Sequence, residues 1–174
     1  MRWSCSPSAP APCPRSSGRK ASSRWRDVSL TLSGEYGARA TRYVVNDDTS
    51  SVMHVAAPVR TEVFVREQGV PQELEWDLED LSALHAVIVD SSGQAVATGR
   101  LLNHAPGVGR IGRMAVLALH RQQGLGQRIL SALMQAAFNR GDRRLVLHAQ
   151  VSAQGFYAQA GFKPHGPVFE EAGI

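Results

Sequence analysis

The feature that most constrains this chain is a glycine-containing turn between an apolar run and an amphipathic pattern. The turn reads Arg-Gln-Gln-Gly-Leu-Gly at 121–126, after the β-prone run at 110–117 and at the start of the helical pattern at 125–140. Such a strand-to-helix turn directs backbone N–H groups toward one point at the positive end of the helix dipole. The sequence therefore predicts an anion site here, suited to a phosphate-bearing ligand.

Positive charge is concentrated at the N-terminus of the 174-residue chain. Residues 1–42 carry eight Lys or Arg and two acidic residues, whereas the remainder has eleven basic and thirteen acidic residues. Residues 1–40 are rich in Ser, Pro and Arg and lack hydrophobic periodicity, which predicts disorder. Both cysteines, Cys5 and Cys13, lie here, so we expect neither a disulfide nor a thiolate metal site in the folded part. No apolar run approaches the length of a membrane span.

Strand-like and helix-like segments alternate after residue 40. Helical patterns cover 49–68, which contains Pro58 and must be broken or kinked there, 125–140 and 153–160. Their apolar faces are predicted to carry Val55, Val59, Val63 and Phe64 in the first helix and Leu125, Ile129, Leu133, Ala136 and Ala137 in the second. The β-prone runs are 41–46, 84–90, 95–103, 110–117, 144–150 and 168–169. This order predicts one α/β or α+β domain over 41–174 with a mixed central sheet.

Charge is partitioned along this domain. No acidic residue occurs between Asp90 and Asp142, although six arginines do, whereas seven acidic residues cluster at 62–80. The acid-free block around the turn predicts an electropositive site for a polyanion. The acidic segment predicts that a cationic ligand binds on the other side of the same cleft.

Two common phosphate signatures do not fit the turn. A P-loop requires Gly-Lys-Ser/Thr, and this chain has Gly126-Gln127-Arg128. A dinucleotide fingerprint requires a third glycine where Ile129 stands. What remains is Arg-x-x-Gly-x-Gly between a strand and a helix.

The surroundings of this motif resemble a known family. The run from Gly109 to Met134 is similar to the acetyl-CoA motif of the GNAT superfamily of acyl-CoA N-acyltransferases. Segment 153–162, with Phe156-Tyr157 and Gly161-Phe162, looks like the helix that follows in that family. Other segments are similar to the ElaA/YjcF-like bacterial branch, namely 63–71, 147–150 and 169–174. The resemblance covers about 43–174 and implies a GNAT-like mixed central β-sheet flanked by helices.

The resemblance implies a binding site for acetyl-CoA as cosubstrate, with no metal. Backbone amides of the turn would hold the pyrophosphate, and a strand would offer backbone groups to the pantetheine arm and the thioester carbonyl. Gln150 stands where much of the family has an Asn that contacts pantetheine. The implied cofactor-binding residues are Met114, Ala115 and Val116 on the strand, Arg121, Gln122, Gln123, Gly124, Leu125 and Gly126 in the turn, and Gln150.

Direct attack of an amine on a thioester needs a base and an acid for the leaving sulfur. Tyr157 matches the family residue that protonates the departing thiolate. Many family members place a Glu on the strand before the phosphate loop, but residues 110–117 contain no carboxylate. Glu67 is our first candidate for the base, followed by Glu75 and His148.

The sequence thus predicts a cytoplasmic N-acetyltransferase that transfers an acetyl group to a primary amine of a small cationic substrate in a ternary complex. Two alternatives stay open, a non-catalytic acyl-CoA-binding module and a nucleic-acid-binding protein that acts through its basic tail. No membrane or specific nucleic-acid partner is expected. The sequence ends at Glu171-Ala172-Gly173-Ile174, whereas branch relatives continue through a Pro-His-containing strand. We therefore expect a shortened last strand, whose exposed edge would favour a homodimer.

Overall fold

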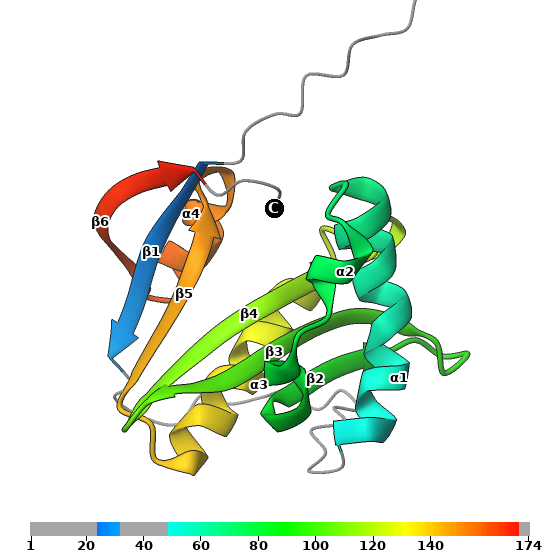
Figure 1. Ribbon diagram of the computed structural model, residues 1–174, viewed down its shortest axis with the longest axis horizontal. Coiled ribbons are helices and arrows are strands. Elements are labelled where there is room, and N and C mark those ends of the chain that lie inside the picture. The colour runs from blue at the N-terminus through cyan, green and yellow to red at the C-terminus, as the bar shows by residue number, and fades with distance from the viewer. Residues whose placement is uncertain (1–23, 32–48, 171–174) are drawn as a thin grey trace, which may run out of the picture.

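A six-stranded sheet forms the centre of the molecule (Figure 1). The computed structural model describes residues 24–31 and 49–170. The strands are β1 (Arg24–Thr31), β2 (Leu84–Val89), β3 (Ala95–Ala105), β4 (Val108–Val116), β5 (Arg144–Gln150) and β6 (Lys163–Glu170). The helices are α1 (Thr49–Arg60), which continues as the π-helix η1 (Thr61–Glu67), α2 (Gln72–Glu75), α3 (Leu125–Arg140) and α4 (Gln154–Gln159). Short 3-10 turns are η2 (Leu78–Ser82), η3 (Ala118–His120) and η4 (Val151–Ala153).

The sheet is mixed and opens in its middle. Its strand order is β2-β3-β4-β5-β1-β6, and the pair β4 and β5 is parallel while the other pairs are antiparallel. The parallel pairing extends only from Val108–Arg110 to Arg144–Val146. Beyond it the two strands diverge, as Figure 1 shows. Beyond Arg110, the edge of β4 that faces β5 has no strand partner among the described residues, and a cleft can form between the halves of the sheet.

Helices cover both faces of the β2–β4 half. Ala86 and Ile88 of β2 belong to the core cluster that includes α3, whereas Val87 between them packs against Val52 and Ala56 of α1. Successive side chains of a strand point to opposite faces, so the continuous apolar run of β2 is explained by burial on both sides. These observations confirm the expected mixed sheet flanked by helices.

The first helical pattern is confirmed, with corrections to its details. Pro58 lies inside α1 rather than at its end. Since proline has no N–H, Pro58 cannot donate to the carbonyl of His54 one turn earlier, yet α1 continues to Arg60 before it changes to the π-helix η1. Val55 was expected on the apolar face but is 40% exposed, while Val52 and Ala56 are buried. In α3 the expected Ala136 is only partly buried, at the margin of the core.

Strand β1 corrects the expected disorder of residues 1–40. Arg24–Thr31 is extended and pairs with β5 on one side and β6 on the other. In the sheet β1 therefore lies between β5 and β6. The other residues of 1–40, and the strand expected at 41–46, lie outside the described residues. At the other end of the chain β6 is longer than the expected run at 168–169.

Candidate active site

The turn at 121–126 has the geometry of an anion cradle. Gly124 has φ +74° and precedes α3 directly. The first helical contact is the Arg128 N–H donating to the Gly124 carbonyl at 3.1 Å. Within the described part of the chain, no acceptor is recorded for the N–H groups of residues 122–127. A set of free N–H groups at the start of a sixteen-residue helix favours a bound anion.

Arg121 anchors this turn to two other elements. Its Nε donates to the Val116 carbonyl at the end of β4, at 3.0 Å. Its Nη2 donates to the carboxylate of Glu67 at the end of η1. Glu67 was the first candidate for the base, and the structure instead pairs it with the turn.

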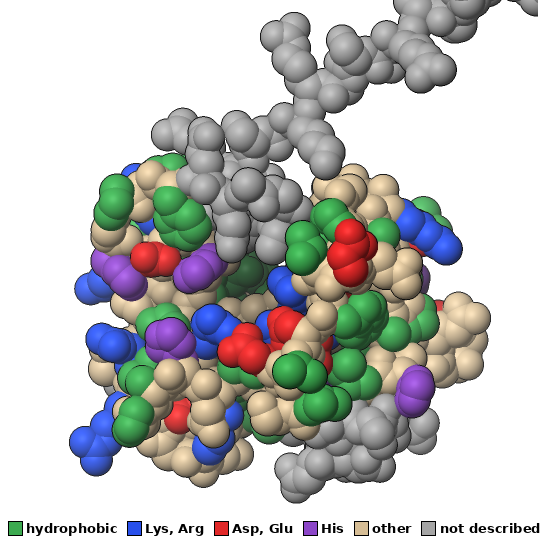
Figure 2. All heavy atoms as spheres, viewed as in Figure 1, with side chains coloured by type: hydrophobic (Ala, Val, Ile, Leu, Met, Phe, Trp, Pro, Cys, Tyr) green, Lys and Arg blue, Asp and Glu red, His purple; other side chains and the backbone are tan. Residues whose placement is uncertain are grey.

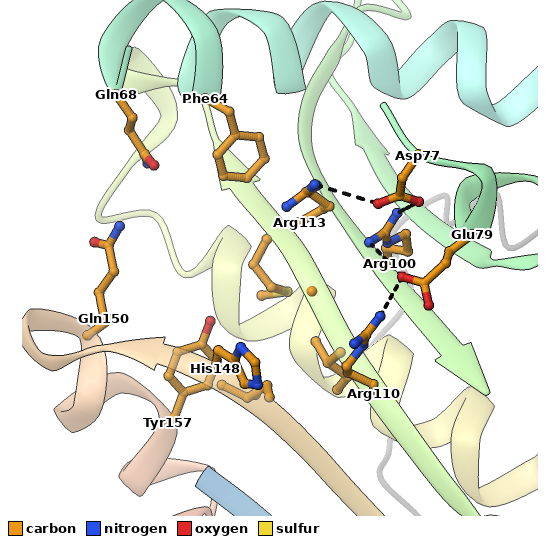
Figure 3. A pocket seen from close by; sticks show the side chains of 15 residues that line it. Phe64, Gln68, Asp77, Glu79, Arg100, Arg110, Arg113, His148, Gln150 and Tyr157 are labelled. Atoms are coloured by element: carbon orange, nitrogen blue, oxygen red, sulfur yellow. Dashed lines mark hydrogen bonds and ion pairs between the residues drawn. The ribbon is translucent and has the colours of Figure 1, made fainter. Parts of the chain in front are cut away.

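Two cavities lie on either side of the end of β4. The loop cavity, of about 350 Å³, is lined by Val63, Glu67, Gln68, Met114, Ala115, Val116, Arg121, Gly126, Phe156 and Tyr157. The central cavity, of about 380 Å³, is lined by Phe64, Gln68, Asp77, Glu79, Arg100, Arg110, Ile111, Gly112, Arg113, Met114, Leu147, His148, Gln150, Ala153 and Tyr157 (Figure 3). Gln68, Met114 and Tyr157 line both, so the cavities meet at these three residues.

Tyr157 stands at this junction. Its ring is buried against Phe156 and Phe162, in edge-to-face contacts with centroid separations of 4.9 and 6.0 Å. Its hydroxyl points into the central cavity (Figure 3). Burial raises the pKa of Tyr157 to about 12. The phenol therefore stays protonated at neutral pH. It can donate a hydrogen bond, or a proton, to a group bound in the cavity.

His148 and Gln150 enter the same cavity from β5. Leu147 and Ala149 of this strand belong to the core, so the alternation of the strand places His148 and Gln150 on its other face. His148 Nε2 lies 3.4 Å from Asp27 Oδ1. The imidazole also packs edge-to-face on Phe169, with 5.4 Å between ring centroids. Of the three candidate bases, His148 is the one that lines the central cavity.

Glu75 is placed in a buried ion-pair network instead. Arg60 donates to it from Nε at 2.5 Å and to Asp80 from Nη1 at 2.7 Å, and all three residues are almost fully buried. Burial raises the pKa of Glu75 more than Arg60 lowers it. Glu75 lines neither cavity. The sequence carried one signal for this network, because Arg60 follows Ala56 by four residues on the apolar face of α1.

The acidic segment at 62–80 is largely neutralised by arginines. Besides the pairs already described, Glu62 pairs with Arg66, Asp77 with Arg100 at 2.8 Å, and Glu79 with Arg110 at 2.5 Å. Figure 2 shows acidic and basic side chains together at the centre of this face, in the region of η2, β3 and β4. The segment does not present a row of free carboxylates. Sequence reasoning included Arg100, Arg110 and Arg113 in an electropositive block but did not predict their pairing with the acidic segment, and it missed Gln68 and Asp27.

Over residues 24–31 and 49–170, no three His, Asp, Glu or Cys side chains are grouped as ligands of one metal ion. Across the same ranges, no helix has the length and apolar character needed to cross a membrane.

The chain has relatives among proteins of known sequence. The family model for the acetyltransferase (GNAT) domain matches residues 46–174. YjcF of Bacillus subtilis, an N-acetyltransferase by name, is 39% identical over 105 residues, which are 60% of this chain and 74% of YjcF. YyaT of the same organism is 32% identical over 130 residues, covering 72% of this chain and 86% of YyaT.

Solved structures agree with this assignment. An acyl-CoA N-acyltransferase from Pseudomonas aeruginosa is 31% identical with a TM-score of 0.67, and the match covers 76% of this chain and 93% of that one. ElaA of Escherichia coli is 26% identical with a TM-score of 0.64, and the match covers 86% and 93%. The chain therefore belongs to the GNAT family of acetyltransferases, enzymes that use an acyl-CoA as cosubstrate.

Proposed function

We propose that the protein transfers an acetyl group from acetyl-CoA to a small primary amine by direct attack in a ternary complex. The observation that carries this proposal is the meeting of the two cavities at Gln68, Met114 and Tyr157. The loop cavity leads from the free N–H groups of the turn to this junction. The central cavity reaches the same junction from the other side, so donor and acceptor can be bound together.

The donor is assigned to the loop cavity. The N–H groups of residues 122–127 are suited to the pyrophosphate of CoA, as a helix N-terminus is suited to other phosphates. Beyond Arg110, the edge of β4 that is not paired with β5 can hydrogen-bond the pantetheine arm and polarise the thioester carbonyl. Gln150 lies across the central cavity from Gln68, which lines both cavities (Figure 3), so Gln150 is assigned a contact to the end of the pantetheine arm where it reaches the junction.

The acceptor enters the central cavity as a cationic ammonium ion and must lose a proton before it can attack. His148 accepts that proton, and Asp27, with Oδ1 3.4 Å from Nε2, holds the imidazole in place. The amine lone pair then forms the C–N bond at the carbonyl carbon, and the adduct loses its second N–H proton to solvent as the C–S bond breaks. Tyr157 supplies a proton to the departing sulfur and takes one back from solvent before the next turnover.

The proposal is tested by incubating the protein with acetyl-CoA and a panel of small primary amines. Release of the CoA thiol, together with the mass of an acetylated amine, is the expected result. Binding of acetyl-CoA without turnover of any amine would instead identify a non-catalytic acyl-CoA-binding module. His148→Gln serves as the matched inactive control, because the substitution lies on a partly exposed face of β5 and is expected to leave the fold intact.

A further inference from the structure

The carboxylates of the central cavity are all engaged by arginines. Asp77 accepts from Arg100 at 2.8 Å, and Glu79 accepts from Arg110 at 2.5 Å (Figure 3). A cationic group that entered the cavity would have to compete with a guanidinium at each carboxylate. The lining does not offer a free anionic partner for a second positive charge on the acceptor.

Arg113 is the exception among the arginines of this cavity. Its contacts to carboxylates are long, 3.4 Å from Nε to Glu75 and 3.6 Å from Nη2 to Asp77. Its one recorded hydrogen bond runs from Nη2 to the Leu74 carbonyl at 3.2 Å. Within the described residues, Nη1 has no recorded partner, and Nε is buried without a hydrogen bond. A guanidinium has five N–H donors, so most of those on Arg113 are unused.

The backbone holds Arg113 in a special position. The register of β3 and β4 shifts between the pairs Thr98–Ala115 and Arg100–Gly112, which leaves a bulge at residues 113–114. Arg113 has φ +51°, in the left-handed region that non-glycine residues seldom adopt. A bulge redirects a side chain, and here Arg113 lines the central cavity next to Met114, which lines both cavities.

The electrostatic balance also favours an anion beside Arg113. The Arg113 side chain is only 18% exposed. Burial lowers the pKa of its guanidinium, and the nearby carboxylate of Glu75 opposes this effect only in part. A ligand carboxylate would satisfy free N–H donors and stabilise the buried charge at once, as in bidentate Arg–carboxylate pairs.

We infer that the acceptor is an amino carboxylate, whose carboxylate binds Arg113 while its amine faces His148 and Tyr157. The inference rests on the proposed acetyl transfer and specifies its acceptor. The cavity of about 380 Å³ has room for a molecule of amino-acid size beside the acyl end of the donor. Because the acceptor is held through its carboxylate, its amine makes no ion pair with the protein. The amine therefore remains available to lose its proton and attack.

The test compares amino acids with their own amides. Glycine, β-alanine and 4-aminobutyrate are each paired with the corresponding carboxamide, and kcat/KM is measured with saturating acetyl-CoA. For the best pair we expect at least a tenfold preference for the carboxylate. Arg113→Gln should remove that preference by raising the KM of the carboxylate about tenfold while leaving the carboxamide unchanged. Arg113→Lys, which keeps a positive charge, should restore part of it.

The matched control is Arg66→Gln, because Arg66 is exposed, pairs with Glu62 on η1 and lines neither cavity. It should leave the kinetics of both members of each pair unchanged. The inference is overturned if the kcat/KM of carboxamides or diamines equals that of the carboxylates. It is also overturned if Arg113→Gln and Arg113→Lys slow the acetylation of both members of a pair equally. In either case the proposed acetyl transfer itself still stands. Absence of turnover with every amine would overturn the proposed function, and the inference with it.

Discussion

His148 on β5 and Asp27 on β1 are cross-strand partners, with 3.4 Å between Nε2 of the imidazole and Oδ1 of the carboxylate. The base assigned to acetyl transfer is thus held by a residue some 120 positions earlier in the chain. If His148 accepts the proton of the amine, His148→Gln should lower kcat by about 10²–10⁴-fold, the usual contribution of a general base. Steady-state kinetics should show an unchanged KM for acetyl-CoA.

Asp27 is expected to act through His148. Because an exposed ion pair contributes about 1 kcal/mol or less, Asp27→Asn should lower kcat by roughly fivefold at most. A double-mutant cycle checks the connection, since Asp27→Asn should cause no further loss when His148 is already Gln. Fully additive losses would show that the two residues act independently.

Tyr157→Phe tests the acid. The ring and its core contacts are kept, so the free energy of unfolding should change by no more than about 0.5 kcal/mol. Loss of the proton donor should lower kcat by about 10²-fold. Since the pKa of Tyr157 is about 12, deprotonation of this phenol should not reduce wild-type activity below about pH 11. Turnover retained in Tyr157→Phe would remove this residue from the mechanism.

Gly124→Ala tests the anion cradle. Nothing lies within 4 Å of an added Cβ, but φ is +74°, so the alanine is strained by about 1 kcal/mol or more. Relaxation of that strain should turn the N–H groups of the turn away from the pyrophosphate and raise the KM for acetyl-CoA about tenfold. Gly107→Ala is the matched control, because Gly107 also has free space and a φ of +69° but lies in the β3–β4 turn. Gly107→Ala should lose a similar free energy of unfolding and keep the wild-type KM for acetyl-CoA. An equal KM for acetyl-CoA in the two variants would contradict the anion cradle.

Local patterns predicted the parts of the fold that local interactions determine. Helix α3 begins and ends where its periodicity and the glycines at 124 and 141 indicate. Strand β1 was missed because Arg24–Thr31 has few apolar residues, and its conformation depends on pairing with two strands more than a hundred residues away. The hydrophobic periodicity of residues 24–31 alone therefore does not predict that this segment pairs with β5 and β6.

The same distinction explains the site. The turn and Tyr157 could be proposed from the sequence because short motifs carry them. The sequence named three candidate bases but could not rank them correctly by position, because Glu67, Glu75 and His148 differ in their partners rather than in their local sequence. Glu67 pairs with Arg121 at a separation of 54 residues, and Glu75 with Arg60 at 15. Only the three-dimensional arrangement shows that, of the three, His148 is the one that lines the central cavity.

Asp80→Asn tests the buried network beneath the central cavity. Burial raises the pKa of Asp80, but hydrogen bonds from Arg60 and Arg100 outweigh it and lower the pKa to about 2. Removal of this charge deprives the buried guanidiniums of Arg60 and Arg100 of one carboxylate partner. This loss should lower the free energy of unfolding by about 3–5 kcal/mol. Chemical denaturation at pH 7 measures this loss.

The pH dependence of stability provides the control for Asp80. A carboxyl with a lowered folded-state pKa stabilises the fold above its unfolded pKa of 3.8 and loses that stabilisation as the pH falls toward 2. Wild type should therefore lose about 2 kcal/mol between pH 4 and pH 2 that Asp80→Asn does not lose. Parallel curves for the two proteins would contradict the shifted pKa.

Val28→Asp tests whether β1 belongs to the sheet. Val28 is 2% exposed and lies opposite Leu147 of β5 and Pro164 of β6. A carboxylate at this position would be buried without a partner, so we expect a loss of at least about 3 kcal/mol in unfolding free energy. Thr31→Asp, at the exposed end of the same strand, is the control and should stay within about 0.5 kcal/mol of wild type. Equal stability of the two variants would mean that Val28 is not buried between β5 and β6, and the Asp27–His148 pair would lose its support as well.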